Sequence, residues 1–412
     1  MIPDYLDLGC TEIVNSARAA VYAERYCLLT ACGPCPGLPE AINDQPYVDP
    51  VTDPAPWYDP AVPESAMFLG VMGVDAVGFS TSTRSRTPVQ LIGDGAALGI
   101  ARRSHRELAY TVLLLVREEC ALPYAQEWLA AALQGAPCEG ECLGDEIGVF
   151  SCCPEGDGLR ELRHLYGVGL IDGPDVTAVR YMDEGVIAEV TFVLAAAPWI
   201  YREPLAGLGD WITLRDGALL TYDPDEVYAD CVDPTPCLRD PLCPAPPLPV
   251  RAPVPVDPCY PTGAAEFRRS VVSLTPDDQP EWLEAVPVLE LETGSTALRR
   301  LIVRFWANPL GSDCMDVADP CAACTDIQIS YLPPGATLLV DGRTQRAEVT
   351  CAAGSQDSVT SAPTLYGPLG QSFEWPVFSC PTGLCIEILS TSATTSAEAR
   401  ARVLLVPRSD VG

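Results

Sequence analysis

A segment rich in proline and cysteine near the middle of the chain limits the possible folds most. Residues 231–259 hold ten prolines and four cysteines in 29 positions. Proline has a fixed φ and no backbone N–H, so this segment can neither continue a helix nor enter the interior of a sheet. We expect an extended, polyproline-like linker that divides the chain into two halves. Its cysteines would attach it to the flanking domains: Cys231, Cys237, Cys243 and Cys259.

Further boundaries follow from length and local composition. A chain of 412 residues suggests two to four domains. Residues 1–65 are acidic and rich in cysteine and proline, which suggests an N-terminal extension. Within it, residues 12–25 contain enough alanine for a short helix. Residues 66–230 and 260–412 then form one domain each, on either side of the linker.

The first half has the composition of a sheet with one helix. Residues 67–79, 84–92, 107–116 and 185–194 are rich in β-branched and aromatic residues and bounded by Gly, Ser or Pro, which predicts strands. Residues 123–135 begin with proline, end with glycine and have one apolar face. They are predicted to form a helix that packs on the sheet.

The second half shows a clear period of two. Apolar residues alternate in four segments, at positions 301–305, 327–331, 338–340 and 399–405. This period predicts strands, and no segment of 260–412 predicts a helix. Many short strands separated by turns favour an antiparallel sandwich. The expected fold class is therefore mostly β, with a first β-sandwich carrying one packed helix and a second antiparallel β-sandwich.

The charge of the chain excludes several partners. There are 56 acidic residues against 25 basic ones, all of them arginine, and the net charge is −31. Such a polyanion is repelled by nucleic acid and by anionic membrane surfaces, so we expect neither as a partner. The first residues do not resemble a secretory signal, and apolar stretches such as 108–116 are too short to span a bilayer, which predicts synthesis in the cytoplasm without membrane insertion.

The arginine pairs allow two interpretations. Arg102 with Arg103, and Arg299 with Arg300, could be solvated faces of their strands. They could equally form subunit contacts, because a guanidinium pairs well with carboxylates in so acidic a chain.

A search for catalytic chemistry finds no motif. The two histidines, His105 and His164, lie outside any recognisable nucleophile motif, and Gly-x-Ser-x-Gly, Walker A and His-Glu-x-x-His sequences are absent. Two Gly-x-Gly sequences, at 93–95 and 167–169, are better interpreted as turns. A pair of carboxylates for glycoside hydrolysis cannot be selected among 56. We predict that the chain is not an enzyme, and we assign no catalytic, cofactor-binding or metal-binding residue and no cofactor.

The 19 cysteines leave three alternatives open. Their spacing could hold zinc or iron, they could form disulfides or remain thiols, or they could serve redox catalysis. Disulfides or thiols are favoured, and the odd number leaves at least one cysteine outside any set of intrachain disulfides. Disulfides would suit a virion component that matures outside the cell. The local clusters are Cys32 with Cys35; Cys138, Cys142, Cys152 and Cys153; and Cys321 and Cys324 with Cys314 nearby.

Two tryptophans in the second half could serve as platforms for a sugar ring. Trp306 alternates with Ile302 and Arg304, and Trp375 stands at the start of a strand. Packing in the core or at an edge of the sandwich is the favoured interpretation for both.

Several segments resemble one class of phage protein. In the first half these are WLAAALQG at 128–135 and VTFVLAAAPWIYREP at 190–204, and in the second YLPPGATLLVDG at 331–342, RAEVT at 346–350, WPVFSCPTG at 375–383 and RVLLVPR at 402–408. The pattern resembles distal tail proteins of long-tailed, non-contractile phages. PWYDP at 56–60, followed by FLGV at 68–71, is similar to the opening of minor tail proteins from phages of actinobacteria. Residues 1–55 and the linker depart from the simplest members.

The resemblance implies a structural role at the tip of a virion tail. Distal tail proteins form a ring, usually of six subunits, that joins the tail tube and tape measure protein to the tail-tip hub and receptor-binding apparatus. Their C-terminal domain is a galectin-like sandwich that projects outward, and no catalytic residues come with the family. The alternative is a carbohydrate-binding tail adhesin that binds host cell-wall glycan through residues 260–412.

Overall fold

A computed structural model describes most of the chain in two compact units. Unit 1 comprises Met1–Glu203 with Arg408–Gly412, and unit 2 comprises Pro204–Pro407. These limits differ from the domain boundaries expected at 66 and 230. The described residues are 3–29, 38–42, 46–135, 145–150, 162–205, 209–222, 265–274, 283–308, 313–314, 324–351, 360–361, 365–366, 373–379 and 383–411. The linker 231–259 lies outside them, so the prediction for it stays a prediction.

A four-stranded antiparallel sheet forms the centre of unit 1. Its order is β11 (Gly169–Met182), β12 (Gly185–Ala196), β8 (Arg106–Val116) and β3 (Phe68–Val77). Strand β8 alternates as a half-buried strand should, and every second residue from Leu108 to Leu114 lies in the core. The strands predicted at 67–79, 107–116 and 185–194 are confirmed.

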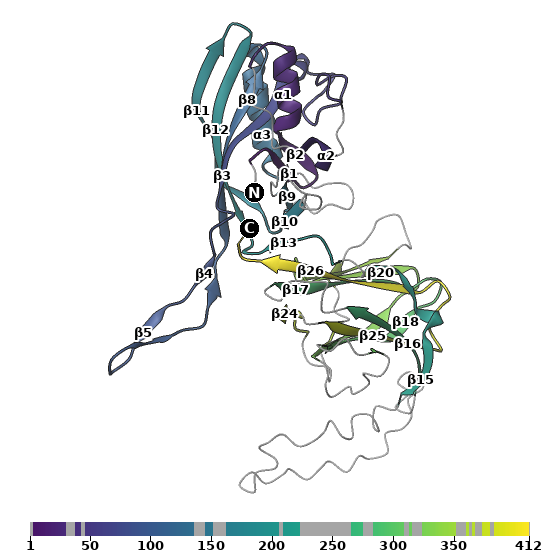
Figure 1. Cartoon of the computed structure of the whole chain (residues 1–412). Helices are drawn as coiled ribbons and strands as arrows, with labels where there is room; N and C mark the ends of the chain where they lie inside the picture. The colour runs from purple at the N-terminus through teal and green to yellow at the C-terminus, as the bar shows by residue number, and fades with distance from the viewer. Residues whose placement is uncertain are drawn as a thin grey trace. The chain divides into compact units, whose positions relative to one another are not determined.

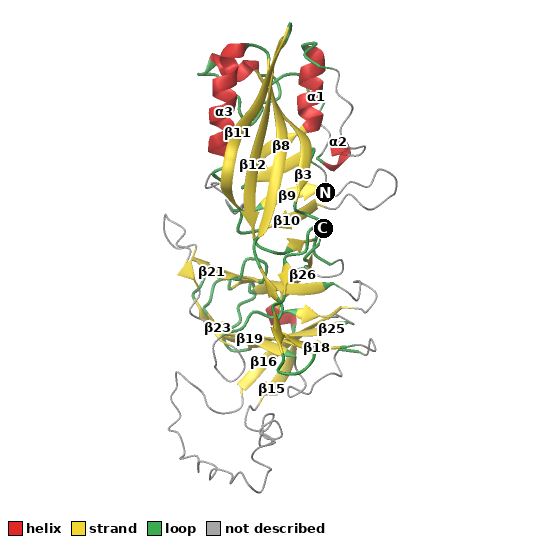
Figure 2. Ribbon diagram, turned by 90° about the vertical axis from the view of Figure 1, so that its left-hand side faces the viewer, coloured by secondary structure: helices red, strands yellow, loops and turns green. Residues whose placement is uncertain are grey.

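Two helices lie on the same side of this sheet (Figures 1 and 2). Helix α3 (Leu122–Ala132) confirms the helix predicted at 123–135, with Pro123 in its first turn. Helix α1 (Ser16–Arg25) forms the second part of the segment 12–25, and the Asn15 side chain caps it by accepting the Arg18 N–H. A short α2 spans Leu38–Ala41. None of the described helices is long and apolar enough to cross a membrane.

Residues near the N-terminus are part of the core of unit 1. Strands β1 (Tyr5–Leu8) and β2 (Thr11–Asn15) pair with each other, and β1 continues into β9 (Ile147–Phe150), β10 (Leu162–Leu165) and β13 (Ile200–Tyr201). The apolar side chains of β1 and β2 are buried with those of the central sheet. The acidic composition of residues 1–65 therefore conceals a regular apolar pattern at their start.

Unit 2 is a sandwich of two antiparallel sheets around one apolar core. One sheet runs β15 (Ala218–Tyr222), β16 (Ala265–Leu274), β25 (Leu384–Thr391), β18 (Leu298–Ala307), β19 (Thr325–Leu332) and β23 (Leu365–Tyr366). The other runs β26 (Arg400–Ser409), β17 (Glu284–Glu292), β20 (Ala336–Asp341), β21 (Arg346–Cys351) and β22 (Thr360–Ser361), with β14 (Ile212–Thr213) on β26 and β24 (Phe378–Ser379) on β17.

The mostly β fold class is thereby confirmed. The alternating residues at 301–305, 327–331, 338–340 and 399–405 fall within strands of unit 2, except Ala399, which directly precedes β26. All of them contribute to its core except Tyr331, which is exposed. In the described part of unit 2, helical structure is limited to the 3-10 turn Leu214–Asp216; unit 1 has two such turns, Pro63–Met67 and Glu119–Ala121.

Candidate assembly surface

A two-stranded ribbon leaves the central sheet of unit 1 between β3 and β8 (Figure 1). It comprises residues 80–105, in which β4 (Arg84–Ser85) pairs with β7 (Arg102–Arg103), and β5 (Pro88–Gln90) pairs with β6 (Ala96–Leu98). The strand predicted at 84–92 is thus split in two. At the tip, Leu91 donates its backbone N–H to the carbonyl of Gly95, so the predicted turn at 93–95 is confirmed.

The ribbon exposes apolar side chains that a soluble surface would normally bury. Ile92 is fully exposed and Ile100 is 89% exposed. Val89, Leu91 and Leu98 are also exposed on the same short ribbon. A cluster of this kind on a projecting element is characteristic of an interaction site.

The charge of the ribbon is opposite to that of the rest of the chain. Four of the 25 basic residues and one of the 56 acidic residues lie in 80–105, so the ribbon carries +3 and the remainder −34. The ribbon is therefore attracted to surfaces with the composition of its own chain, at distances limited by the Debye length.

Both edges of the central sheet also expose apolar side chains. Strands β3 and β11 are the outer strands, and each lacks a neighbour on one side among the described residues. Val74 and Val77 are exposed on β3, and Ile171 and Val176 on β11. The β3 edge is already occupied at its middle, where the Ser16 hydroxyl accepts the N–H of Gly73. The free edges are templates for pairing with another chain.

A buried arginine fixes the base of the ribbon. Arg106 is 2% exposed and donates to five backbone carbonyls. Nη1 bonds those of Gly78 at 2.5 Å, Phe79 at 3.0 Å and Thr81 at 2.9 Å. Nη2 bonds those of Pro198 at 3.2 Å and Asp410 at 2.7 Å. Burial lowers the pKa of the Arg106 guanidinium, and the charge of Asp410 acts in the opposite direction.

The arginine pairs predicted as solvated faces or subunit contacts divide between different roles. Arg103 lies over the ring of Trp199 at 4.1 Å, which ties the returning ribbon strand to the turn after β12. Arg102 is exposed on β7. Arg299 and Arg300 lie over the rings of Tyr331 and Phe267, both at 5.9 Å. The sequence does not distinguish these contacts because each ring comes from a segment distant in sequence.

The two histidines contact carboxylates rather than a hydroxyl or thiol group. His105 Nε2 lies 3.2 Å from Glu107 Oε1, with both side chains mostly exposed. His164 Nδ1 lies 2.8 Å from Glu146 Oε1, and its Nε2 lies 4.0 Å from Glu203 Oε1. Neither geometry is that of a base activating a nucleophile.

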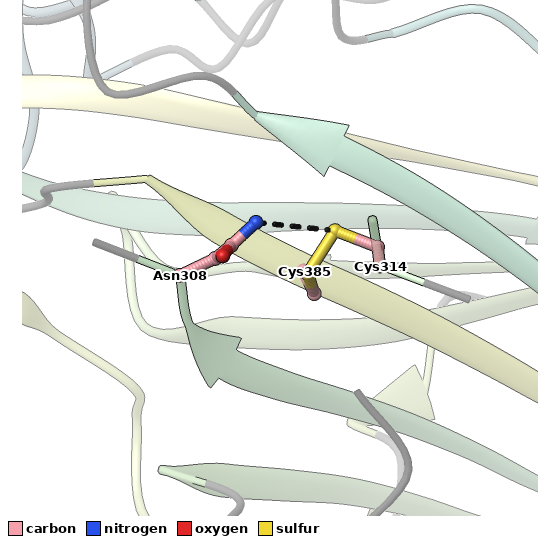
Figure 3. Close-up of a disulfide and its surroundings, with 3 residues drawn as sticks. All are labelled: Asn308, Cys314 and Cys385. Carbon is pink, nitrogen blue, oxygen red and sulfur yellow. Dashed lines mark hydrogen bonds between the residues drawn. A yellow bond between two sulfur atoms is a disulfide. The ribbon is translucent and has the colours of Figure 1, made fainter. Parts of the chain in front are cut away.

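The described cysteines include both disulfides and free thiols. Cys314 and Cys385 form a disulfide that is packed against Trp306, and the Asn308 side-chain amide donates to Cys314 Sγ at 3.7 Å (Figure 3). Cys314 is therefore not available as a metal ligand beside Cys324, so that version of the metal hypothesis is wrong. Cys10 is also a disulfide cysteine. The free thiols in the described part are Cys27, Cys120, Cys324 and Cys351. Cys32, Cys35, Cys138, Cys142, Cys152, Cys153 and Cys321 lie outside the described residues.

The two tryptophans considered for sugar binding are packing residues. Trp306 is 2% exposed, and Trp375 packs on the core of unit 2 with the ring of Phe373 at 4.9 Å. The packing interpretation is confirmed for Trp306, which cannot present a face to a ligand.

A different tryptophan lies among polar side chains on unit 2. The ring of Trp211 lies 4.4 Å from the Arg400 guanidinium carbon and 4.8 Å from that of Arg402. Arg400 Nε bonds Glu292 Oε2 at 2.6 Å, and Arg402 Nε bonds Glu290 Oε2 at 2.8 Å. Sequence reasoning missed this group. The sequence contained one signal for it. Arg400 and Arg402 are two positions apart on β26, and Glu290 and Glu292 are two positions apart on β17.

Comparisons with known proteins give only distant structural similarity. No protein-family model matches the sequence, and no curated protein matches it. One solved structure is the Dit protein of phage SPP1, described as a paradigm of the hub adsorption apparatus in phages that infect Gram-positive bacteria. It has 11% identity and a TM-score of 0.36, with 83% of this chain and 94% of that chain covered.

Two further solved structures with similarity to this chain are those of the phage p2 baseplate in its activated conformation, one with Sr and one with Ca. Each has 9% identity and a TM-score of 0.41, and covers 83% of this chain and 92% of the other. Values this low do not establish a family or a function for this chain.

Proposed function

We propose that this chain is a structural protein of a phage tail tip, a distal tail protein that associates with copies of itself in a ring. The observation that carries the proposal is the ribbon 80–105, an apolar and basic element on a strongly acidic chain. The positive charge of the ribbon is complementary to the acidic surface of a second copy of the same chain, and its exposed apolar side chains could be buried there. The role is structural and needs no catalytic step.

The central sheet offers a second contact with the correct direction. Adjacent strands in the order β11, β12, β8, β3 are antiparallel, so β3 and β11 run in opposite directions. The free part of β3 in one copy can therefore pair antiparallel with β11 of the next, which extends the same sheet. An interface between two different surfaces of one subunit produces a ring if the rotation closes. A ring of six would follow the resemblance in the sequence.

The same proposal assigns partners and a location. A ring at the tail tip would contact the tail tube, the tape measure protein and the tail-tip hub. Unit 2, a sandwich of the type expected from the galectin-like resemblance, would face outward on the virion. An actinobacterial host is part of the proposal and rests on the sequence resemblance at 56–71 alone.

The oligomeric state of the purified full chain tests the proposal. Light scattering after size exclusion and negative-stain microscopy should show closed rings. Replacing Ile92 and Ile100 with serine should reduce assembly at least tenfold, as expected when apolar contacts of about 1.4 kcal/mol are lost. The matched control is Val51→Ser, which changes an exposed valine of unit 1 outside the ribbon. A chain that stays monomeric at every concentration and salt would overturn the proposal.

Carbohydrate binding by unit 2 is the second candidate, and the surroundings of Trp211 favour it. A tryptophan ring beside paired arginine and glutamate side chains provides apolar contact and hydrogen bonds to hydroxyl groups. Sedimentation of the full chain with host cell walls should show binding that Trp211→Ala removes. Trp375→Ala is not a suitable control because that ring is packed on the core, so Tyr331→Ala, an exposed aromatic residue, serves instead. Equal sedimentation of parent and Trp211→Ala would exclude this site.

A further inference from the structure

The last residues of the chain lie in a different unit from the strand that leads to them. Strand β26 belongs to unit 2 up to Pro407, and the tail, residues 408–411, belongs to unit 1. In unit 1 the tail extends a sheet, because Arg408 pairs with Tyr201 and Ser409 with Ile200. One continuous strand therefore contributes to both units.

The tail contacts both strands at the base of the ribbon. The Asp410 carboxylate lies 3.2 Å from Arg84 Nη2 and accepts the Ser82 hydroxyl at 3.4 Å, both on the outgoing strand. On the returning side, Arg408 lies over the Trp199 ring at 3.8 Å, the same ring that Arg103 contacts. The tail thus reaches the outgoing side through the Asp410 carboxylate, and the returning side through Arg408 and the shared Trp199 ring.

The tail also completes the surroundings of a buried charge. The carbonyl of Asp410 is one of the five that Arg106 bonds; the other four belong to residues 78, 79 and 81, which follow β3, and to Pro198 in the turn after β12. A buried guanidinium is tolerated only when its N–H groups have acceptors. Removal of Asp410 leaves Nη2 with the longer bond to Pro198.

We infer that the tail is a latch that fixes the base of the ribbon within unit 1. When Arg408 and Asp410 leave the ribbon base, the ribbon loses its fixed direction. The latch does not depend on the proposed function. Only the role of the ribbon in assembly rests on the proposed function.

Hydrogen exchange of the full chain as a monomer tests the latch. Deletion of residues 408–412 should increase exchange at 80–86 and 102–106 about tenfold or more, with β12 unchanged. Asp410→Ala removes the carboxylate but keeps the backbone carbonyl, so it should give a smaller increase at the same positions. This second variant keeps the test valid if the deletion variant does not fold. Val51→Ser, at an exposed valine of unit 1 outside the ribbon and the tail, is the control and should change nothing. Unchanged exchange at the ribbon base in both the deletion and Asp410→Ala would overturn the inference.

The hydrogen-exchange readout needs no ring, so a failure of ring formation leaves the latch result separate.

Discussion

Arg106 and Arg304 are the least exposed of the described arginines in units 1 and 2, and they face different kinds of hydrogen-bond acceptor. Arg106 in unit 1 is surrounded by backbone carbonyls. Arg304 in unit 2 is 1% exposed and faces carboxylates, with Nε 3.3 Å from Asp326 Oδ2 and Nη1 3.7 Å from Glu387 Oε2. Glu387 also accepts Arg269 Nε at 2.5 Å, which extends the group across the sheet.

The difference shows what each arginine does for the fold. Carbonyl acceptors come from any segment, so Arg106 can gather the ends of three chain segments whose side chains are unrelated. Carboxylates must be supplied by side chains on neighbouring strands, so Arg304 fixes the register of β18 against β19 and β25. Even beside Arg304, burial raises the pKa of the Asp326 carboxyl, and the guanidinium only opposes this shift.

The largest expected effect comes from breaking the carboxylate group in unit 2. Glu387→Ala removes the residue that Arg304 and Arg269 share and leaves two largely buried charges. The free energy of unfolding of unit 2 should fall by about 3–5 kcal/mol. Urea denaturation followed by hydrogen exchange of β18 and β25 measures this loss. The control Glu374→Ala changes an exposed carboxylate, and an equal effect of both would contradict the comparison.

A smaller loss is expected when the carbonyl-bonded arginine is changed. Arg106→Lys keeps the charge but offers three donors to five carbonyls. At least one buried carbonyl loses its donor, so the free energy of unfolding of unit 1 should fall by about 1–3 kcal/mol. Denaturation followed at β8 measures the effect. Arg102→Lys, on an exposed residue of the same ribbon, is the control. If Arg106→Lys were as stable as the parent, water would be donating the hydrogen bonds that these carbonyls accept.

The two arginines also show how much of the structure can be predicted from the sequence. The period of two correctly predicted that residues 301, 303 and 305 face the core of unit 2, and it therefore placed Arg304 on the opposite face. That face is buried too, and the partners of Arg304 lie on strands 22 and 83 positions away in sequence. Strand register is a tertiary property, so no local pattern indicates these pairs.

Arg106 illustrates a different limit. In the sequence it is one of a basic cluster at 102–106 and looks like its exposed neighbour Arg102. Arg106 is buried because the tail and the turn after β12 contact its side chain. Strand β11 was missed because Gly173 and Pro174 interrupt its pattern, and its side chains are mostly exposed, which is tolerated at the edge of a sheet. The edge strands and the ribbon are the elements that carry the proposed assembly, and they are the least regular in sequence.

Asp7, a partly buried carboxylate of unit 1, provides a third case. Burial raises the pKa of the Asp7 carboxyl above its ordinary value of 3.8, although the hydrogen bond from the Gly148 N–H opposes the shift. The native state then binds the proton more tightly than the unfolded state. The stability that Asp7 contributes is complete below pH 3.8 and is lost as the pH rises through the native pKa.

Asp7→Asn should remove this pH dependence, because an amide oxygen can still accept the Gly148 N–H. The variant should therefore gain stability over the parent as the pH rises from 4 to 7, and the gain should level off above the native pKa. Urea midpoints at several pH values measure it. Asp183→Asn, in an exposed turn of unit 1, should show no such trend. A gain that is equal at every pH would point to packing rather than to charge.

The smallest effect is expected at the exposed end of the latch. Arg84 is about half exposed and pairs with the Asp410 carboxylate at 3.2 Å, so Arg84→Ser should cost less than about 1 kcal/mol of global stability. Its effect on the ribbon base should still be visible in hydrogen exchange, because local opening there requires less energy than unfolding of unit 1. Raising the salt concentration in the parent should have a similar effect, since exposed pairs are screened. A global loss as large as that of Arg106→Lys would mean that the ribbon base folds as part of the core, and the distinction between a buried anchor and an exposed latch contact would no longer hold.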